Sequence, residues 1–484
     1  MDNLELGKNI KTRHLFALAF GCIIGIGWII LLGAWLEQGG PLGAMIAFTF
    51  GALLMLLIGL CYAEVATMLP AAGGEVVFSY EISGTKSSFA MGWFLALSFV
   101  ATISFEAISA GWIISAMIPG VEGKALYMSG GEPVKLGVLL IGVVGMALLF
   151  ILNYRGTKSA ATFQEIMTYL LIVISLVFMA AGIIWGKIEN LEPLFAKTGT
   201  LPVLGGIASV FILVPFMLSG FEVIPQSMEE IAPGTSLKTV GRIILISIGA
   251  ALVFYLLVIL ASSMVVPWKK LIALDLPAAG AFEAAFKSAL MTKTVLFAGL
   301  CGIITTWNPC FIVASRIIFA LGRARIIPPV LGKIHPVFKS PFVAVIFVGI
   351  TSTIGVFLGK SAVVPVANVA AATIAVAYGS TCLVMIKLRR SRPDAHRPYR
   401  VRGGSVVGIM GFVGCIFLVF LALYQPWVDA KGAFPLEWTI LIIWSILGIL
   451  FWFFARKIRS RVSEEERYKL LLAASANTPS SKSS

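Results

Sequence analysis

The sequence has little charge and few residues of the kinds that build metal or catalytic centres. Only 12% of its 484 residues are charged, against 59% hydrophobic residues and a mean hydropathy of +0.97. This composition is rare in soluble proteins and typical of a polytopic membrane protein. The three histidines lie at loops or span edges, and the six cysteines fall in apolar runs without metal-ligand spacing. With no nucleophile motif or phosphate-binding loop either, we expect no metal, no cofactor and no enzymatic activity.

Apolar runs long enough to cross a bilayer recur along the chain. We predict twelve spans, at about 15–37, 42–67, 89–118, 136–153, 164–186, 203–225, 240–265, 293–320, 342–359, 362–388, 406–425 and 436–455. Lys and Arg concentrate in alternate connecting segments, above all in the loop 389–405 and the tail 456–484. By the positive-inside rule, these segments, the N-terminal segment 1–14 and both termini face the cytoplasm. The net charge of +14 is therefore a topology signal for the cytoplasmic membrane and does not indicate nucleic-acid binding. We expect the charged and then Ser-rich tail to lack fixed structure.

The first span is interrupted by glycine. The stretch Gly21–Gly27 reads Gly-Cys-Ile-Ile-Gly-Ile-Gly, and so many glycines are unfavourable in a helix interior. A break leaves one half-helix that ends near Ile24 with free carbonyls and another that begins near Gly27 with free amides. Such a gap suits a zwitterion, whose carboxylate binds the amides and whose ammonium binds the carbonyls. The alternative is that the glycines only permit close helix packing.

The sixth span has a comparable interruption, in the run Pro215-Phe-Met-Leu-Ser-Gly-Phe-Glu222. Pairing spans one and six divides the core into two five-span halves, 15–186 and 203–388. Because each half has an odd number of spans, the halves lie in opposite orientations in the membrane. This is the pattern of an inverted-repeat carrier with a site near the midplane. The last two spans, 406–455, lie outside the repeat.

Other polar residues inside the spans are candidates for the site. Glu106 and Glu222 are carboxylates in apolar spans, so they must face the protein interior or water. If both face the cavity and are ionised, they favour a cationic amine as substrate. Trp307 and Asn308 precede Pro309 in span eight and are candidates to line the pocket, although a structural role for Asn308 is the alternative.

Five motifs resemble, in their order, those of the amino acid–polyamine–organocation superfamily. They are Gly21–Gly27, Pro70–Tyr80, Asn153–Lys158, Ser219–Pro233 and Ala314–Pro328. From about residue 12 to 455 the chain resembles a bacterial amino acid permease of that group. The resemblance implies an all-α membrane protein with twelve transmembrane helices. These form a LeuT-type 5+5 inverted repeat with broken helices 1 and 6, plus two extra helices.

The resemblance also implies a substrate site at the two breaks. The α-ammonium would meet carbonyls near Ile23 and of Phe216 and Ser219, and Phe216 would be an aromatic gate. The α-carboxylate would meet the amides of Ile26 and Gly27. The whole predicted set of substrate-binding residues is Ile23, Ile24, Gly25, Ile26, Gly27, Phe216, Ser219, Gly220, Trp307 and Asn308. The chain departs from many members at Trp28, which either narrows the pocket or lies on the helix surface.

These observations predict a secondary active transporter that moves amino acids across the membrane by alternating access, as a proton-coupled symporter or an exchanger. Its partners are then a small-molecule substrate and the lipid bilayer. The alternative within carriers is an organic amine such as a polyamine, ethanolamine or a basic amino acid. A major-facilitator carrier would show a long loop between spans six and seven, and a channel would show pore-lining rings of like groups. The sequence shows neither.

The coupling ion stays open between several options. In proton-coupled members of the superfamily, a lysine in the fifth span occupies the place of sodium. This chain has Leu171 there, and Lys158 lies too near the cytoplasmic surface to substitute. The options are exchange without an ion, a sodium site at Thr305 or Thr306, and protonation of a membrane carboxylate. We favour protonation of Glu222, which adjoins the mobile half of span six, over Glu106. The competing interpretation is that Glu222 caps backbone groups freed by the break at Gly220.

Overall fold

The computed structural model describes residues 11–70, 74–155, 160–228, 231–232, 234–338, 340–430 and 432–472, and these are nearly all helical. The first half contains α1 (Thr12–Ile23), α2 (Gly27–Ile30), α3 (Leu32–Met68), α4 (Gly74–Met117), β1 (Ala125–Ser129), β2 (Glu132–Lys135), α5 (Leu136–Arg155), α6 (Ala160–Trp185) and η1 (Ile188–Leu191). The second half contains α7 (Thr200–Met217), α8 (Val223–Gln226), α9 (Leu237–Val265), α10 (Trp268–Leu271), α11 (Pro277–Phe286), α12 (Ala289–Arg323), η3 (Pro329–Gly332), α13 (Phe342–Val356), η4 (Lys360–Ala362), α14 (Val363–Ser391), α15 (Ser405–Asp429), α16 (Leu436–Phe454), α17 (Arg456–Arg459) and α18 (Glu464–Leu472).

Each of the twelve predicted spans is helical in the structure. Among the described residues, 11 helices are long and apolar enough to cross a membrane, and α13 is a shorter apolar helix at the predicted ninth span. Two of the long helices bend at a glycine with positive φ. In α3 this is Gly40 (φ 70°), where the chain turns between the first and second spans, and in α4 it is Gly84 (φ 70°), which precedes the third span.

The helices divide into a buried set and a peripheral set. In the most apolar 18-residue stretch of each helix, 83% of the residues are buried in α14, against 17% in α5 and in α16. The helix α1 packs against α6, α9 and α12, while α4 packs against α12 and α14. Because α5 and α16 expose most of their apolar side chains, they are the helices that present most surface to lipid. The first broken span therefore lies inside the bundle, with 78% of its most apolar window buried, whereas α7 is buried mainly towards its end at the break.

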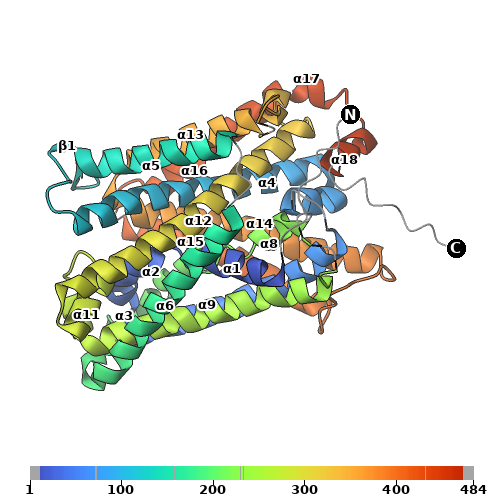
Figure 1. The fold of residues 1–484 in the computed structure, drawn as a ribbon. Helices are drawn as coiled ribbons and strands as arrows, with labels where there is room; N and C mark the ends of the chain where they lie inside the picture. The colour runs from blue at the N-terminus through green and yellow to red at the C-terminus, as the bar shows by residue number, and fades with distance from the viewer. Residues whose placement is uncertain are drawn as a thin grey trace.

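Short elements cover the two ends of the helices (Figure 1). At one end lie the antiparallel hairpin β1–β2, which the sequence analysis did not anticipate, and α11. The helix α11 packs against α2 and α12, so the segment between the seventh and eighth spans covers the second half of span one. The helices α17 and α18 lie at the opposite end.

The expectation that the tail beyond Arg456 lacks fixed structure is wrong for residues 456–472. Arg467 in α18 has a side chain only 2% exposed, and it donates hydrogen bonds to Thr85 Oγ1 at 2.9 Å and Glu464 Oε1 at 2.8 Å. Glu464 also accepts a hydrogen bond from the Tyr80 hydroxyl. These contacts hold α18 against the first segment of α4. Composition misled the prediction because few side chains anchor the helix: the buried Arg467, together with Leu471 and with Tyr468, which stacks on Tyr80. Residues 473–484 lie outside the described residues.

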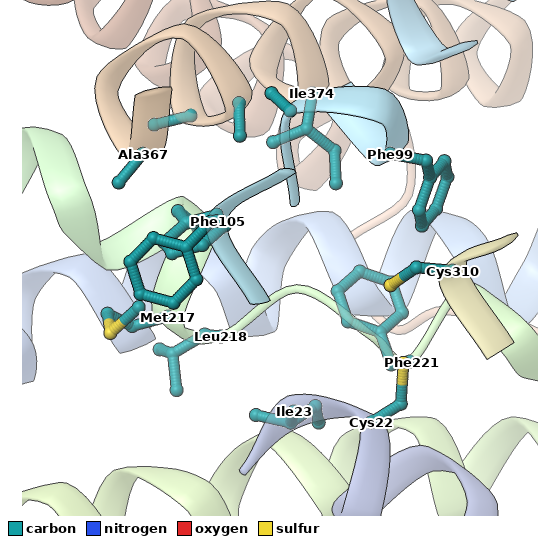
Figure 2. Packing of buried hydrophobic residues seen from close by; sticks show 14 of the residues in the cluster. Cys22, Ile23, Phe99, Phe105, Met217, Leu218, Phe221, Cys310, Ala367 and Ile374 are labelled. Atoms are coloured by element: carbon teal, nitrogen blue, oxygen red, sulfur yellow. The ribbon is translucent and has the colours of Figure 1, made fainter. Parts of the chain in front are cut away.

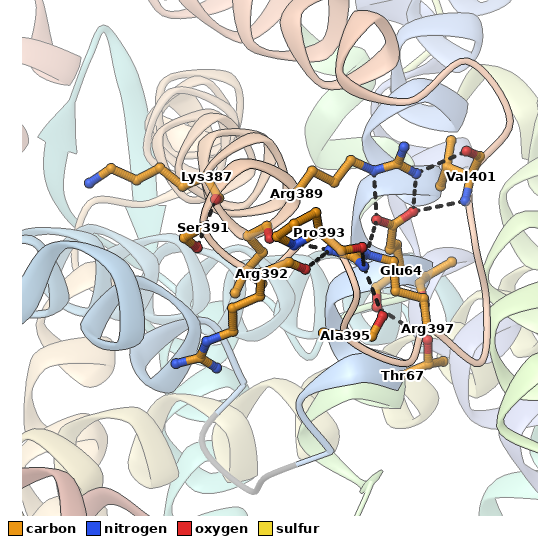
Figure 3. Close-up of polar contacts among 12 residues, drawn as sticks. Glu64, Thr67, Lys387, Arg389, Ser391, Arg392, Pro393, Ala395, Arg397 and Val401 are labelled. Carbon is orange, nitrogen blue, oxygen red and sulfur yellow. Dashed lines mark hydrogen bonds and ion pairs between the residues drawn. The ribbon is translucent and has the colours of Figure 1, made fainter.

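The basic loop 389–405 is held by one buried carboxylate at the end of the second span (Figure 3). Glu64, whose side chain is 2% exposed, accepts a hydrogen bond from Arg389 Nε at 2.7 Å and pairs with Arg397 Nε at 3.2 Å. Its second oxygen also accepts the backbone N–H of Val401 at 2.8 Å. Both oxygens are therefore satisfied, and the loop is fixed by side chains far apart in the sequence.

Candidate functional site

The break in the first span lies between α1 and α2. Residues 24–26 are not helical, and the N–H of Ile24 still bonds the carbonyl of Phe20 at 2.8 Å. The amides of Gly25 and Ile26 form no backbone hydrogen bond within the described part of the chain. These donors are therefore available to an anion, as the sequence predicts for this stretch.

The carbonyls at the end of α1 already have partners. The Tyr255 hydroxyl donates to the Ile23 carbonyl at 3.2 Å, and Thr306 Oγ1 donates to the Cys22 carbonyl at 3.2 Å. The predicted acceptor for the ammonium at Ile23 is thus shared with a tyrosine from α9. Nothing in the sequence marked Tyr255, which is one of several hydroxyl residues in an apolar span.

The break in the sixth span touches the break in the first. Residues 218–222 separate α7 from α8, and they cross beside Cys22 and Ile23 in Figure 2. Gly220 has a φ of 123°, and a Cβ placed on it would lie 2.7 Å from the backbone of Cys22 and of Ile23. Only glycine allows this approach. The two interruptions that the sequence pairs are therefore in contact.

Glu222 caps the second break. Its Oε2 accepts the N–H of Gly220 at 2.6 Å, and its Oε1 accepts a hydrogen bond from the Tyr378 hydroxyl. The side chain is fully buried and does not line the cavity described below. This is the capping role that the sequence analysis kept as the alternative to proton transfer.

A narrow cavity lies where the two breaks meet, and it leaves about 20 Å³ for the centre of a water molecule. That is room for about one water. The cavity is lined by Cys22, Ile23, Gly25, Gly27, Ser98, Phe99, Thr102, Phe105, Glu106, Phe216, Met217, Ser219, Gly220, Tyr255, Thr306, Cys310 and Ile374. Of the ten predicted substrate-binding residues, the structure brings Ile23, Gly25, Gly27, Phe216, Ser219 and Gly220 to the cavity. Ile24 and Ile26 are buried beside it, with only their backbone at the break.

Glu106 is the acidic side chain among the described residues that line the cavity. Its carboxylate lies against the first break, because a Cβ on Gly25 would be 2.8 Å from Glu106 Oε1 and 2.7 Å from Thr306 Oγ1. The other oxygen, Oε2, is buried and has no hydrogen-bond partner. A buried carboxylate oxygen without a donor is costly unless a proton or a cation is supplied. Glu106 is therefore the side chain in this cavity with unused binding capacity.

Phe216 lies at the cavity as the gate prediction requires. Its ring packs edge-on against Phe105, with the ring centroids 5.1 Å apart, and its residue is 7% exposed. The carbonyl of Phe216 accepts the Ser219 hydroxyl at 2.8 Å, so this local turn uses one of the predicted ammonium acceptors. The aromatic pair closes one side of the cavity.

Trp307 and Asn308, which the sequence analysis predicts to line the pocket, do not line this cavity. Trp307 faces α5, since a Cβ on Gly145 would meet its ring at 2.7 Å, and Asn308 Oδ1 accepts a hydrogen bond from Asn153 Nδ2 at 3.0 Å. Thr306 and Cys310, four residues apart, are the α12 side chains at the cavity. A helix turns about 100° per residue, so the positions next to Thr306 point elsewhere. Asn308 thus has the structural role.

The remaining candidates lie around the cavity. The Thr305 hydroxyl donates to the carbonyl of Gly302 in its own helix at 3.0 Å, which leaves Thr306 as the only cavity hydroxyl of the predicted sodium pair. Leu171 is fully buried, and Lys158 lies outside the described residues. Trp28 packs among aromatic side chains, 5.7 Å from Phe254 between ring centroids, and does not line the cavity.

Helices that span a membrane and enclose a cavity between two broken spans are the architecture of a membrane carrier. The amino acid permease family model matches residues 10–454, and the chain belongs to this family. It is thus an amino acid transporter of the amino acid–polyamine–organocation superfamily and not an enzyme.

Several characterised relatives match over most of the chain. The branched-chain amino acid permease BcaP of Bacillus subtilis (strain 168) is 26% identical over 95% of both chains. The methylthioribose transporter of the same organism is 25% identical over 94% of both chains. Its glutamate/serine transporter AimA is 26% identical over 93% of this chain and 82% of the relative.

Proposed function

We propose that the chain transports a neutral, apolar amino acid, held in the cavity between the two breaks, together with a proton carried by Glu106. The observation that carries the proposal is the Glu106 carboxylate, buried at the cavity beside Gly25 with one oxygen lacking a donor. The amides of Gly25 and Ile26, with that of Gly27 at the start of α2, are the donors for the substrate carboxylate. The ammonium faces the carbonyls at Phe216 and Ser219 and the oxygens of Glu106.

The rest of the cavity selects the substrate side chain. Phe99, Phe105, Phe216, Met217 and Ile374 give it an apolar wall. A cavity this narrow, with room for about one water, does not hold an amino acid, so the Phe216–Phe105 pair must part for binding. Apolar walls favour a substrate such as those named for the branched-chain permease BcaP.

Charge balance supports a proton on Glu106. A zwitterion adds no net charge to a closed cavity, and a neutral carboxyl leaves that cavity uncharged in the low-dielectric interior. An ionised Glu106 would instead require a cationic substrate. The second candidate function, transport of an organic amine, follows if Glu106 is ionised. A thermal-shift screen of neutral amino acids against amines separates the two functions.

Replacing Glu106 by Gln tests the proton step. In sodium-free liposomes we expect the wild type to accumulate substrate when an inward proton gradient is imposed, by up to about tenfold for each pH unit because one proton accompanies each substrate. The Glu106→Gln variant should still exchange substrate for substrate but should not accumulate it. Glu106→Asp, which keeps the carboxyl, is the matched control. Gradient-driven accumulation by the Gln variant, or an absolute need for sodium, would contradict the proposal.

The orientation in the membrane is part of the proposal. The basic loop 389–405 and the helices α17 and α18 form the cytoplasmic end, with α11 and the β1–β2 hairpin outside. Both termini are then cytoplasmic, and the membrane is the cytoplasmic membrane. With this orientation the segment of α4 that precedes Gly84 belongs to the inner gate, since it contacts α18.

A further inference from the structure

A second buried carboxylate, Glu75, lies outside the cavity, in the first segment of α4. This residue is 1% exposed, and the same segment contacts α18 through Tyr80. Its carboxylate reaches α8, the inner half of the broken sixth span, where Gln226 Nε2 donates to Glu75 Oε2 at 2.6 Å. A Cβ on the preceding Gly74 would lie 2.5 Å from that same nitrogen, so glycine permits the close approach. The contact joins a fixed helix to the half-helix that must move.

The hydrogen bonds around this contact do not balance when Glu75 is ionised. Glu75 Oε1 and Gln226 Oε1 are both buried and have no partner. Both atoms are acceptors, and neither can satisfy the other. The Tyr62 hydroxyl, a buried donor that faces Glu75, can satisfy one of these two acceptors, and a proton on Glu75 Oε1 supplies the second donor. With that proton, Glu75 can donate to Gln226 Oε1 while it accepts from Gln226 Nε2, so both orphan oxygens can have a partner.

Burial and the charge of Glu222 favour the neutral form of Glu75, and they outweigh the hydrogen bonds from Tyr62 and Gln226, which favour its charged form. The titratable groups that face it are Tyr62 on α3, Glu222 before α8 and Tyr378 on α14. Glu75 forms no ion pair within the described ranges. Glu222 has a donor on each oxygen, and its negative charge, when it is ionised, opposes a second charge on Glu75. Burial, with a smaller contribution from Glu222, raises the pKa of Glu75 from 4.5 to about 7.

We propose that Glu75 is a proton-binding site of the inner gate, protonated and paired with Gln226 when the gate is closed and ionised when the gate is open. On closure an O–H bond forms at Glu75 Oε1, with the proton taken from cytoplasmic water. On opening α8 moves away, the carboxyl meets water, and the proton returns to the solvent. This site is distinct from Glu106 and binds its proton whether or not a substrate is present. The inference rests on the alternating access proposed above and not on the identity of the substrate.

The direction of the effect follows from linkage. The closed gate binds a proton with a pKa of about 7, whereas an exposed carboxyl has the ordinary value of 4.5. Closure is therefore stabilised as the cytoplasmic pH falls from about 7 towards 4.5, and this stabilisation is lost as the pH rises above 7. Between those limits the ratio of closed to open protein changes by up to about tenfold for each pH unit.

Infrared titration of the full-length protein in lipid tests whether the proton binds. The wild type should show a protonated-carboxyl band that disappears with a midpoint near pH 7. The part of the band that titrates near pH 7 should be absent from Glu75→Gln, and its frequency should be shifted in Glu75→Asp. Glu222→Gln is the matched control, because it removes the neighbouring carboxylate and should leave a Glu75 band with a lowered midpoint. Loss of the band in Glu222→Gln together with its retention in Glu75→Gln would overturn the assignment.

Amide hydrogen exchange of α8 tests the effect on the gate. After correction for intrinsic rates, α8 in the wild type should be about tenfold better protected one pH unit below the midpoint than one unit above it. Glu75→Gln, which is always neutral, should stay protected at both values, and Glu75→Asp should keep a pH response. Equal pH responses in the wild type and Glu75→Gln would overturn the proposal. No substrate is added in either experiment, so failure of the proposed amino acid transport leaves both readouts interpretable.

Discussion

Replacing Gly220 by Ala should abolish transport. At a φ of 123° an alanine is strained by about 1–3 kcal/mol. Its Cβ would also stand 2.7 Å from the backbone of Cys22 and Ile23, where no flexible side chain can give way. The two breaks must separate, and the amides at Gly25 then shift away from the acceptors on the opposite side of the cavity. A displacement of about 1 Å in such a site is worth roughly a hundredfold in activity.

Gly84→Ala is the matched control for that experiment. Gly84 also has a positive φ, 70°, but a Cβ there meets nothing within 4 Å. The alanine at 84 therefore brings backbone strain without a clash at the breaks. Substrate binding to purified protein, measured beside the melting temperature, should be lost in Gly220→Ala and kept in Gly84→Ala. Equal binding by the wild type and Gly220→Ala would mean that contact between the breaks does not shape the site.

Replacing Glu64 by Ala should destabilise the protein more than any other single charge removal discussed here. Glu64 is the one carboxylate that faces both Arg389 and Arg397 in the described part of the chain, and the Arg397 side chain is only 4% exposed. Removing one partner of a buried pair leaves an uncompensated buried charge and costs about 3–5 kcal/mol. The loop 389–405 would lose its anchor, because Val401 also donates its N–H to Glu64.

The measurement is the melting temperature and the fraction of monodisperse protein after purification. Glu465→Ala is the control, since Glu465 pairs with Lys469 on the exposed face of α18, where both side chains are more than 70% exposed. We expect that control to melt like the wild type. A Glu64→Ala protein that melts like the control would show that the loop is held by its backbone packing alone.

The breaks, and much of the site, could be predicted because glycine in an apolar span is a local signal. Gly25, Gly27 and Gly220 lie at the cavity or at its walls, as their positions in two equivalent spans indicate. The direction in which a side chain points from a continuous helix could not be predicted in the same way. Trp307 and Asn308 are polar residues near a proline, yet one step along α12 decides which face they occupy. That rotation depends on packing against α4 and α5, which no short motif encodes.

Hydrogen-bond partners on distant helices could not be predicted from the sequence either. Glu106 and Glu222 look alike in the sequence, each a carboxylate in an apolar span. The structure separates them because Tyr378 on α14 reaches Glu222, whereas no donor reaches Glu106 Oε2. The order in the tail arose in the same way, from the contact of Arg467 with Thr85. Each of these outcomes depends on side chains more than a hundred residues apart.

The cavity itself can be tested directly with the chain's own cysteines. Cys22 and Cys310 line it, while Cys61, Cys382 and Cys415 are buried elsewhere. Liposomes containing the wild type are treated with a permeant maleimide during turnover, with and without saturating amino acid, and labelling is followed peptide by peptide. We predict that the transported amino acid slows the labelling of Cys22 and Cys310 severalfold and leaves that of Cys61, Cys382 and Cys415 unchanged. A transported amino acid that protects neither Cys22 nor Cys310 would place the substrate outside the cavity between the breaks.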